Sequence, residues 1–170
     1  MAQPDANSLC RECGLCCNGV IFANVQLRPG DDAARLRALG LTFARSKALK
    51  FKQPCAAFGG CQCNIYSERP VYCREFECLL LKSAKSGKVG INEARKAIRS
   101  ALKQAEKVKT LLRQLGDTDE ALALGKRFQS IQRKVERGPY DKPAAHLYGE
   151  LTLEFHELNM LLSEKFYPHA

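Results

Sequence analysis

The stretch CRECGLCCNG, residues 10–19, places four of the nine cysteines of this chain within eight positions. Two of them, Cys16 and Cys17, are adjacent, and the other five cysteines all fall between residues 55 and 78. Cysteines clustered at two-residue spacing in a reducing compartment more often bind metal than form disulfides. The clustering therefore predicts a thiolate metal site in the first half of the chain.

Composition and hydrophobicity set the context for these thiols. The chain has 170 residues, 45% of them hydrophobic, which is enough for a packed core that does not depend on disulfides. The N-terminal sequence MAQPDANSLC lacks the basic start and the apolar segment of a secretory signal, and no apolar run is long enough to span a membrane. We therefore expect a cytoplasmic protein that has no membrane partner and keeps its cysteines reduced.

The spacing within the first group is compatible with two kinds of metal. Cys10, Cys13 and Cys16 match the first three ligands of a ferredoxin-type iron–sulfur sequence. The usual fourth cysteine is missing, because position 20 is Val20, so a further ligand has to come from Cys17 or from the 55–78 group. The same C-x2-C steps suit a tetrahedral zinc site. Spacing alone leaves an iron–sulfur cluster and zinc both open.

The adjacent pair Cys16–Cys17 bears on the number of metal centres. Adjacent side chains generally diverge, most clearly in extended backbone, so one compact site would use both only with difficulty. We expect either two centres or one cluster and a separate thiol. If there are two, we expect each to draw thiolates from both cysteine groups, with Cys16 and Cys17 facing different centres. Arg69 and Arg74 flank the second group and could offset the negative charge of such thiolates.

The order of the cysteines resembles that of a known family. CRECGLCC (10–17), the Pro54–Cys55 pair and CNIYSERPVYCREFEC (63–78) are similar to the CxxCxxCC family, the YkgJ-type cysteine-cluster proteins, whose domain is described as zinc- or iron-chelating. The resemblance covers roughly residues 10–80 and leaves Cys61 as an extra cysteine. It implies eight metal ligands. These are Cys10, Cys13, Cys16, Cys17, Cys55, Cys63, Cys73 and Cys78.

Hydrophobic periodicity predicts a mostly α protein of the α+β class. Residues 1–81 hold every cysteine and are expected to form a small irregular metal-binding domain, with a short strand within residues 20–28 and a helix that begins after Asp31 or Asp32. In residues 82–170, apolar residues recur every three or four positions in three segments. These segments run from Ile91 to Leu115, from Ala121 to Val135 and from Leu147 to Phe166. They predict a three-helix antiparallel bundle packed on or beside the first domain.

Residues 82–113 are strongly basic, with ten Lys or Arg residues and two Glu residues in a chain of net charge +9. Such a segment can bind a nucleic-acid backbone or an acidic protein. It has no aromatic residue between positions 77 and 127, which weakens stacking on single-stranded nucleic acid. A solvated helix face is the simpler interpretation of this charge.

These patterns predict a metal-binding protein with one or two thiolate-ligated centres that hold an iron–sulfur cluster or zinc. Two alternatives belong to other functional classes. One is a redox or group-transfer enzyme that uses the cluster, and the resemblance keeps this open because the family includes a domain of a flagellin lysine N-methylase. The other is a zinc-stabilised adaptor that binds RNA or an acidic protein through residues 82–113. The sequence predicts no catalytic residue.

Overall fold

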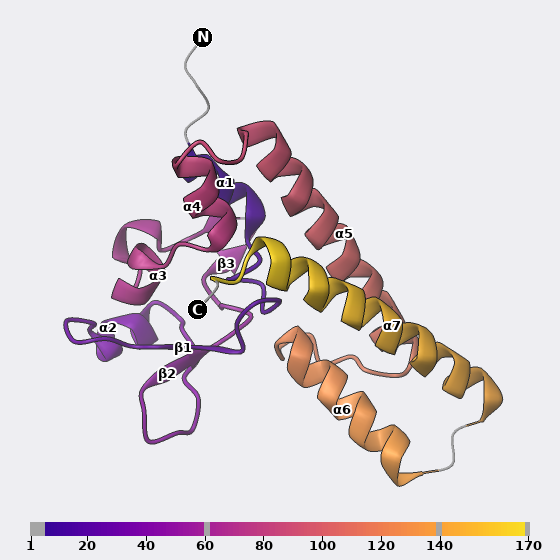
Figure 1. Cartoon of the computed structure of the whole chain (residues 1–170). Helices are drawn as coiled ribbons and strands as arrows, with labels where there is room; N and C mark the ends of the chain where they lie inside the picture. The colour runs from indigo at the N-terminus through magenta and orange to yellow at the C-terminus, as the bar shows by residue number, and fades with distance from the viewer. Residues whose placement is uncertain (1–5, 60–61, 139–140, 169–170) are drawn as a thin grey trace.

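The computed structural model describes residues 6–59, 62–138 and 141–168, so Cys61 lies outside the described residues. Helices dominate, which confirms the mostly α, α+β class (Figure 1). The helices are α1 (Ala6–Cys13), α2 (Ala33–Ala38), α3 (Val71–Glu75), α4 (Leu79–Lys85), α5 (Ile91–Gln114), α6 (Leu124–Arg137) and α7 (Lys142–Lys165), with a 3₁₀ turn η1 (Tyr66–Glu68). The strands are β1 (Asn24–Gln26), β2 (Lys50–Lys52), β3 (Phe58–Gly59) and β4 (Gln62–Cys63).

Two small antiparallel sheets lie in the cysteine-rich half. Strand β1 pairs with β2, placing Val25 opposite Phe51, and β3 pairs with β4. The strand expected within residues 20–28 is therefore only three residues long. Val25 and Phe51 are buried and form a small core together with Leu36 and Leu41. This core holds the loops of the cysteine-rich half together without a large sheet.

Helix α2 begins and ends as its sequence predicts. The side chain of Asp32 accepts the backbone N–H of Arg35 at 2.9 Å and caps the first turn. Gly40 follows the helix with φ +94°, a conformation that glycine adopts without strain. Asp31 has a different role, because its carboxylate accepts the backbone N–H of Val71 at 2.8 Å and so ties this turn to α3.

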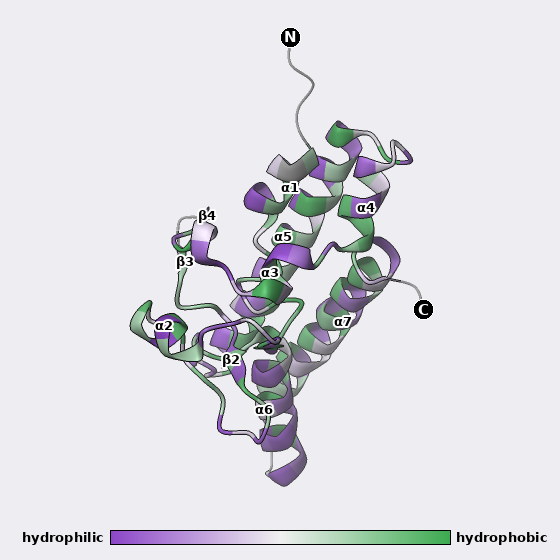
Figure 2. Ribbon diagram, turned by 90° about the vertical axis from the view of Figure 1, so that its left-hand side faces the viewer, coloured by the Kyte–Doolittle hydropathy of each residue, from purple (hydrophilic) through white to green (hydrophobic). Residues whose placement is uncertain are grey.

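Three long helices make up the second half, and α5 packs along α7 (Figure 1). Hydrophobic and hydrophilic residues alternate along them, as expected for helices with one buried face (Figure 2). Helix α7 begins earlier than the apolar pattern predicts, at Lys142, because Asp141 caps it by accepting the N–H of Ala144 at 2.9 Å. Helix α6 begins later, at Leu124. Gly116, with φ +80°, follows α5, which ends at Gln114.

The larger hydrophobic core joins the cysteine-rich segment to the long helices. Leu9 and Leu15 are buried together with Ile98 of α5 and Leu162 of α7. Two backbone hydrogen bonds support this packing. The N–H of Leu79 donates to the carbonyl of Phe166 at 3.0 Å, and the N–H of Leu124 donates to the carbonyl of Gly19 at 2.9 Å. The start of α6 is thereby fixed beside Gly19, just after the first four cysteines, and the end of α7 is fixed beside the start of α4, next to Cys78.

Among the helices in the described part of the chain, none is both long and apolar enough to cross a bilayer.

Candidate metal centre

The first cysteine group folds as a short helix followed by a tight turn. Helix α1 carries Cys10 and Cys13, and the chain then reverses at Gly14, whose φ is +64°. The N–H groups of Cys17 and Asn18 each donate to the carbonyl of Gly14 at 2.9 Å. This turn brings Cys16 and Cys17 back beneath the helix. A side chain at position 14 would force the ring of Phe58 to shift, since its Cβ would lie 2.5 Å from that ring.

The second cysteine group comes from four separate short elements. Cys55 follows Pro54, Cys63 lies at the end of β4, Cys73 lies in α3, and Cys78 is the N-cap residue of α4. The N–H of Cys55 donates to the carbonyl of Cys17 at 2.8 Å, so the two groups are joined through their backbones.

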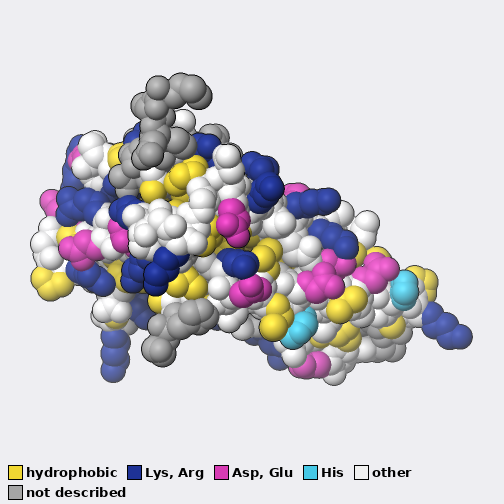
Figure 3. All heavy atoms as spheres, turned by 45° about the horizontal axis from the view of Figure 1, so that its top comes forward, with side chains coloured by type: hydrophobic (Ala, Val, Ile, Leu, Met, Phe, Trp, Pro, Cys, Tyr) yellow, Lys and Arg dark blue, Asp and Glu magenta, His cyan; other side chains and the backbone are white. Residues whose placement is uncertain are grey.

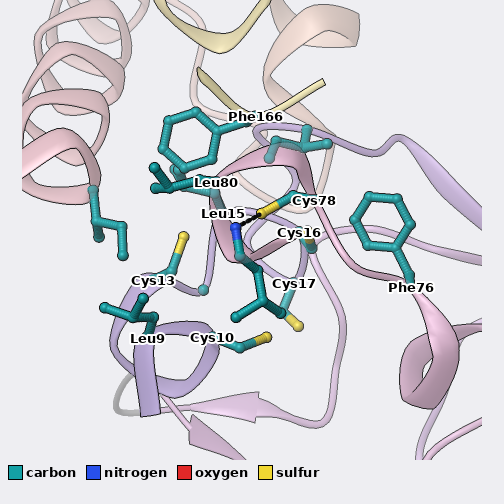
Figure 4. Close-up of a pocket in the computed structure, with 14 residues that line it drawn as sticks. Leu9, Cys10, Cys13, Leu15, Cys16, Cys17, Phe76, Cys78, Leu80 and Phe166 are labelled. Carbon is teal, nitrogen blue, oxygen red and sulfur yellow. Dashed lines mark hydrogen bonds between the residues drawn. The ribbon is translucent and has the colours of Figure 1, made fainter. Parts of the chain in front are cut away.

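Two neighbouring cavities are lined by all eight cysteines of the family pattern. The first has an empty volume of about 520 Å³, counting the part open to solvent, and Leu9, Leu80 and Phe166 form part of its wall (Figure 4). Its cysteines are Cys10, Cys13, Cys16, Cys17 and Cys78. The second has an empty volume of about 840 Å³ and a wall rich in aromatic side chains. Its cysteines are Cys10, Cys16, Cys17, Cys55, Cys63 and Cys73.

The electrostatic neighbours of Cys16 and Cys17 differ. Burial raises the pKa of the Cys16 thiol, and the nearby thiols that raise it further are first of all Cys13 and Cys78. Burial raises the pKa of Cys17 to about 12, and there the leading neighbours are Cys55 and Cys73. The leading thiol neighbours of the two adjacent cysteines therefore differ, although both cysteines line both cavities and Cys10 lies near each of them.

Burial has the same effect on other thiols of the site. It raises the pKa of Cys13 to about 12 and that of Cys73 to about 12. Thiols in this state are protonated at neutral pH and are poor nucleophiles. A cation placed among them would favour the thiolates, and its binding would release protons. The arrangement suits metal ligation better than covalent catalysis by a free cysteine.

Backbone N–H groups point at several of the sulfurs. The N–H of Leu81 donates to the Cys78 sulfur at 3.4 Å, the dashed contact in Figure 4. Burial raises the pKa of Cys55, and backbone hydrogen bonds from Ala57 and Phe58 act in the opposite direction. Such donors stabilise a negatively charged sulfur, which is the form that binds metal.

One arginine lies beside both thiol sets. Arg69 lines the second cavity, and its charge opposes the effect of burial on the pKa of Cys10 and of Cys73. Its guanidinium lies 3.5 Å from the centroid of the Tyr66 ring, and its Nε donates to the Tyr66 carbonyl at 2.9 Å. Arg69 thus fits the charge-balancing role expected of it, whereas Arg74 is not among the residues that line either cavity.

The thiols surround the two cavities without converging on one point. Within residues 6–59, 62–138 and 141–168, no three Cys, His, Asp or Glu side chains are close enough to hold a single metal ion. A mononuclear site would therefore need the thiols to move inward. In a cluster, each thiolate binds a different iron atom, so the ligands lie farther apart than those of a single ion.

Two residues of the site, Gln53 and Arg11, could not be identified from the sequence pattern. Gln53, a polar residue in a loop, is 3% exposed and lines the second cavity. Arg11, on α1, lies over the ring of Tyr66, which is far from it in the sequence, and its guanidinium carbon is 5.1 Å from the ring centroid. Arg11 lines the same cavity. Both placements depend on tertiary packing, so residue spacing does not predict them.

Comparison with known proteins gives one match. Residues 9–110, more than half of the chain, match the family model described as "CxxCxxCC: Putative zinc- or iron-chelating domain". No match was found among curated proteins or among solved structures.

Proposed function

The chain belongs to the CxxCxxCC family, and on this premise we propose that it is a metal-binding protein with two thiolate-ligated centres. Each centre draws thiolates from both cysteine groups. The first consists of Cys10, Cys13, Cys16 and Cys78, and the second of Cys17, Cys55, Cys63 and Cys73.

The division of Cys16 from Cys17 is the observation that carries this proposal. Cys16 has Cys13 and Cys78 as its leading thiol neighbours, whereas Cys17 has Cys55 and Cys73. Four thiolates complete the coordination of one zinc ion or one four-iron cluster. Eight thiols in two such sets therefore provide complete donor sets for two centres.

Among the metals, the donor arrangement favours iron–sulfur clusters over zinc. Cys10, Cys13 and Cys16 have ferredoxin spacing, and the thiols around each cavity are too far apart to hold one ion as they stand. A bound cluster would supply one-electron redox chemistry, whereas zinc would act as a structural cross-link. Either metal needs reduced cysteines, so a cytoplasmic location belongs to the same proposal.

The residues of the chain have three roles around such a centre. The thiols donate the ligands, the N–H groups of Leu81, Ala57 and Phe58 stabilise the sulfur charge, and Arg69 offsets it between the two sets. Leu80 and Phe166 form part of the apolar wall of the first cavity.

Anaerobic purification followed by elemental analysis and absorption spectroscopy tests this function. Two clusters would give about eight iron atoms per chain and a broad visible absorption, and the zinc form would give about two colourless zinc ions. One metal centre with four thiols left free would contradict the two-centre model. Reduced protein that binds neither metal would contradict metal binding itself.

A second candidate function, binding of a polyanion, rests on three basic residues of α5. Lys96, Arg99 and Lys103 are exposed at helical spacing and form no ion pair among the described residues. Arg95, by contrast, pairs with Glu12, and Lys107 pairs with Glu154. On the face drawn in Figure 3, Lys and Arg side chains are interspersed with Asp and Glu. Retention of RNA or heparin at low salt, abolished when the three residues become Glu, would support an adaptor over a solvated face.

A further inference from the structure

The second cavity is the larger of the two cavities that the cysteines line. Six cysteines line the second cavity and five line the first. The empty volume of the second cavity is about 840 Å³, whereas that of the first is about 520 Å³. The additional wall is aromatic. Phe22, Tyr72 and Phe76 pack together there, with Tyr72 and Phe76 stacked at 5.6 Å and an interplanar angle of 9°. Apolar walls with a few polar groups are typical of small-molecule sites.

A buried hydrogen-bond acceptor lies in this wall. Gln53 is 3% exposed, and its Oε1 atom has no hydrogen-bond partner within the described part of the chain. The residue lines the second cavity. Its backbone is held independently, because the N–H of Gln53 donates to the carbonyl of Ala23 at 3.1 Å. A buried carbonyl oxygen without a donor is unfavourable, so this position calls for a ligand that brings an N–H or O–H group.

An arginine side chain, that of Arg11, lines the same cavity. Arg11 is exposed, lies over the Tyr66 ring, and forms no ion pair with any residue that the structure describes. Arg69 contacts the same ring, but its charge acts on the thiols of Cys10 and Cys73. Arg11 is therefore the cation that remains to bind an anionic group.

We propose that the second cavity binds a small, flat organic acid beside the second cysteine set, with Gln53 Oε1 accepting a hydrogen bond from the ligand and Arg11 binding its carboxylate. The aromatic wall accounts for a flat ligand, because rings stack on rings. Ligand binding at this site depends on the cavity and not on a particular metal. The ligand-site proposal therefore goes beyond the metal-binding proposal and can be tested separately from it.

Three small probes of the same shape separate the two polar contacts. Pyrrole-2-carboxylate carries both the N–H donor and the carboxylate. Furan-2-carboxylate lacks the N–H, and pyrrole-2-carboxamide lacks the charge. Each is titrated by calorimetry into the full chain purified anaerobically, and the metal content of the same sample is measured. We expect pyrrole-2-carboxylate to bind, and the furan acid to bind about tenfold more weakly, because it leaves Gln53 Oε1 unpaired.

Matched variants assign each contact. Gln53→Met keeps the length of the side chain without the acceptor and should abolish the difference between the pyrrole and furan acids. Arg11→Gln should weaken both acids and leave the carboxamide unchanged. Arg133→Gln, an exposed arginine of α6 that does not line the cavity, should change nothing.

The outcomes that overturn the proposal are distinct from those that overturn metal binding. The proposal fails if none of the probes binds at millimolar concentration, or if binding is the same in Gln53→Met and Arg11→Gln as in the parent. A sample without metal that still discriminates the probes supports the ligand site and counts against the metal centres. If Gln53→Met loses helicity, the variant is misfolded and cannot be used. The affinities of the three probes for the parent and for Arg11→Gln then decide whether the ligand-site proposal holds.

Discussion

The N–H of Cys55 donates a hydrogen bond of 2.8 Å to the carbonyl oxygen of Cys17. This bond joins two cysteines that are far apart in the sequence and places the second group directly beside the end of the first. It holds the backbone of Cys17 beside Cys55, whereas the leading thiol neighbours of the preceding residue, Cys16, are Cys13 and Cys78. This relationship supports the two-centre proposal, because the leading neighbours change within a single residue step.

The first prediction is that Cys16→Ser and Cys17→Ser each remove one centre. A hydroxyl is a poor substitute for a thiolate ligand, so each variant should hold about half of the parent metal, and the double variant should hold almost none. Elemental analysis of anaerobically purified protein gives the ratio. Cys61→Ser is the control and should keep the full metal content. Complete loss of metal in both single variants would indicate one shared centre instead.

The second prediction concerns the turn at Gly14. An alanine there would combine a φ of +64° with a Cβ 2.5 Å from the ring of Phe58, so Gly14→Ala should destabilise the fold and lower the metal content. Gly30→Ala is a matched control, because Gly30 has φ +96° and nothing lies within 4 Å of the added Cβ. It should cost about 1–2 kcal/mol from backbone strain alone. Equal losses of unfolding free energy in the two variants would show that the Phe58 contact is unimportant.

The third prediction concerns a buried ion pair in the helical half. The Nε of Arg127 donates to Asp117 at 2.6 Å, and both side chains are almost fully buried, at 3% and 6% exposure. Asp117→Asn would leave the buried guanidinium with only the exposed carboxylate of Glu120, 4.0 Å from Nη2, and should lower the free energy of unfolding by about 3–5 kcal/mol.

Urea denaturation followed by circular dichroism measures this loss. The exposed pair Arg28–Glu75 has the same 2.6 Å separation, so Glu75→Gln is the control and should cost less than about 1 kcal/mol. The double variant Asp117→Asn/Arg127→Met should recover part of the stability, because it removes the buried charge. A similar loss in Asp117→Asn and Glu75→Gln would show that burial does not matter here.

The long helices could be predicted because their apolar residues repeat over many turns. Ile98 and Val108 of α5 belong to one such stripe, and Gly116 marks its end. Helix α4 is different. It has only seven residues, a length at which an apolar run fits a strand as well as a helix, and its cap is the thiol of Cys78. Neither its type nor its start could be read from the pattern.

The family resemblance implied eight cysteine ligands, and these eight line the two cavities, but the other walls of the site were not predicted. The expectation that Cys16 and Cys17 face different centres came from the divergence of neighbouring side chains and stays a prediction. The burial of Gln53 and the position of Arg11 over Tyr66 could not be predicted, because they arise where segments distant in sequence meet. Polar residues in loops are mostly exposed, so burial of Gln53 runs against the ordinary expectation.

The fourth prediction tests the proposed division into residues 1–81 and 82–170. Residues 88–170 expressed alone should remain helical, because the three stripes can bury one another. The fragment should be less stable than the full chain, since Ile98 and Leu162 lose their contacts with Leu9 and Leu15. Circular dichroism with thermal melting measures both properties. A fragment that is mostly coil would mean that the two parts fold as one unit.

The last prediction is a pH dependence that comes from Glu154 on α7. The hydrogen bond from Lys107 lowers the pKa of Glu154, and Gln104, whose Nε2 donates to Glu154 Oε2 at 2.6 Å, lowers it further against the opposing effect of burial. Because the folded pKa lies below the ordinary value of 4.5, the charged carboxylate stabilises the fold above that value. The stabilisation is lost as the pH falls through the folded pKa.

Glu154→Gln isolates this effect, because the amide still accepts the hydrogen bond from Gln104 but has no charge to titrate. The difference in unfolding free energy between parent and variant, measured by urea denaturation at each pH, should be largest above about pH 5 and should close as the pH falls below about 4. Loss of metal in acid affects both proteins, so it cancels in the difference. Glu157→Gln, a neighbour on α7 that contacts Gln104 at 3.3 Å, is the control and should show a smaller difference. A gap between parent and Glu154→Gln that stays constant from pH 7 to pH 3 would show that the charge of Glu154 does not stabilise the α5–α7 contact.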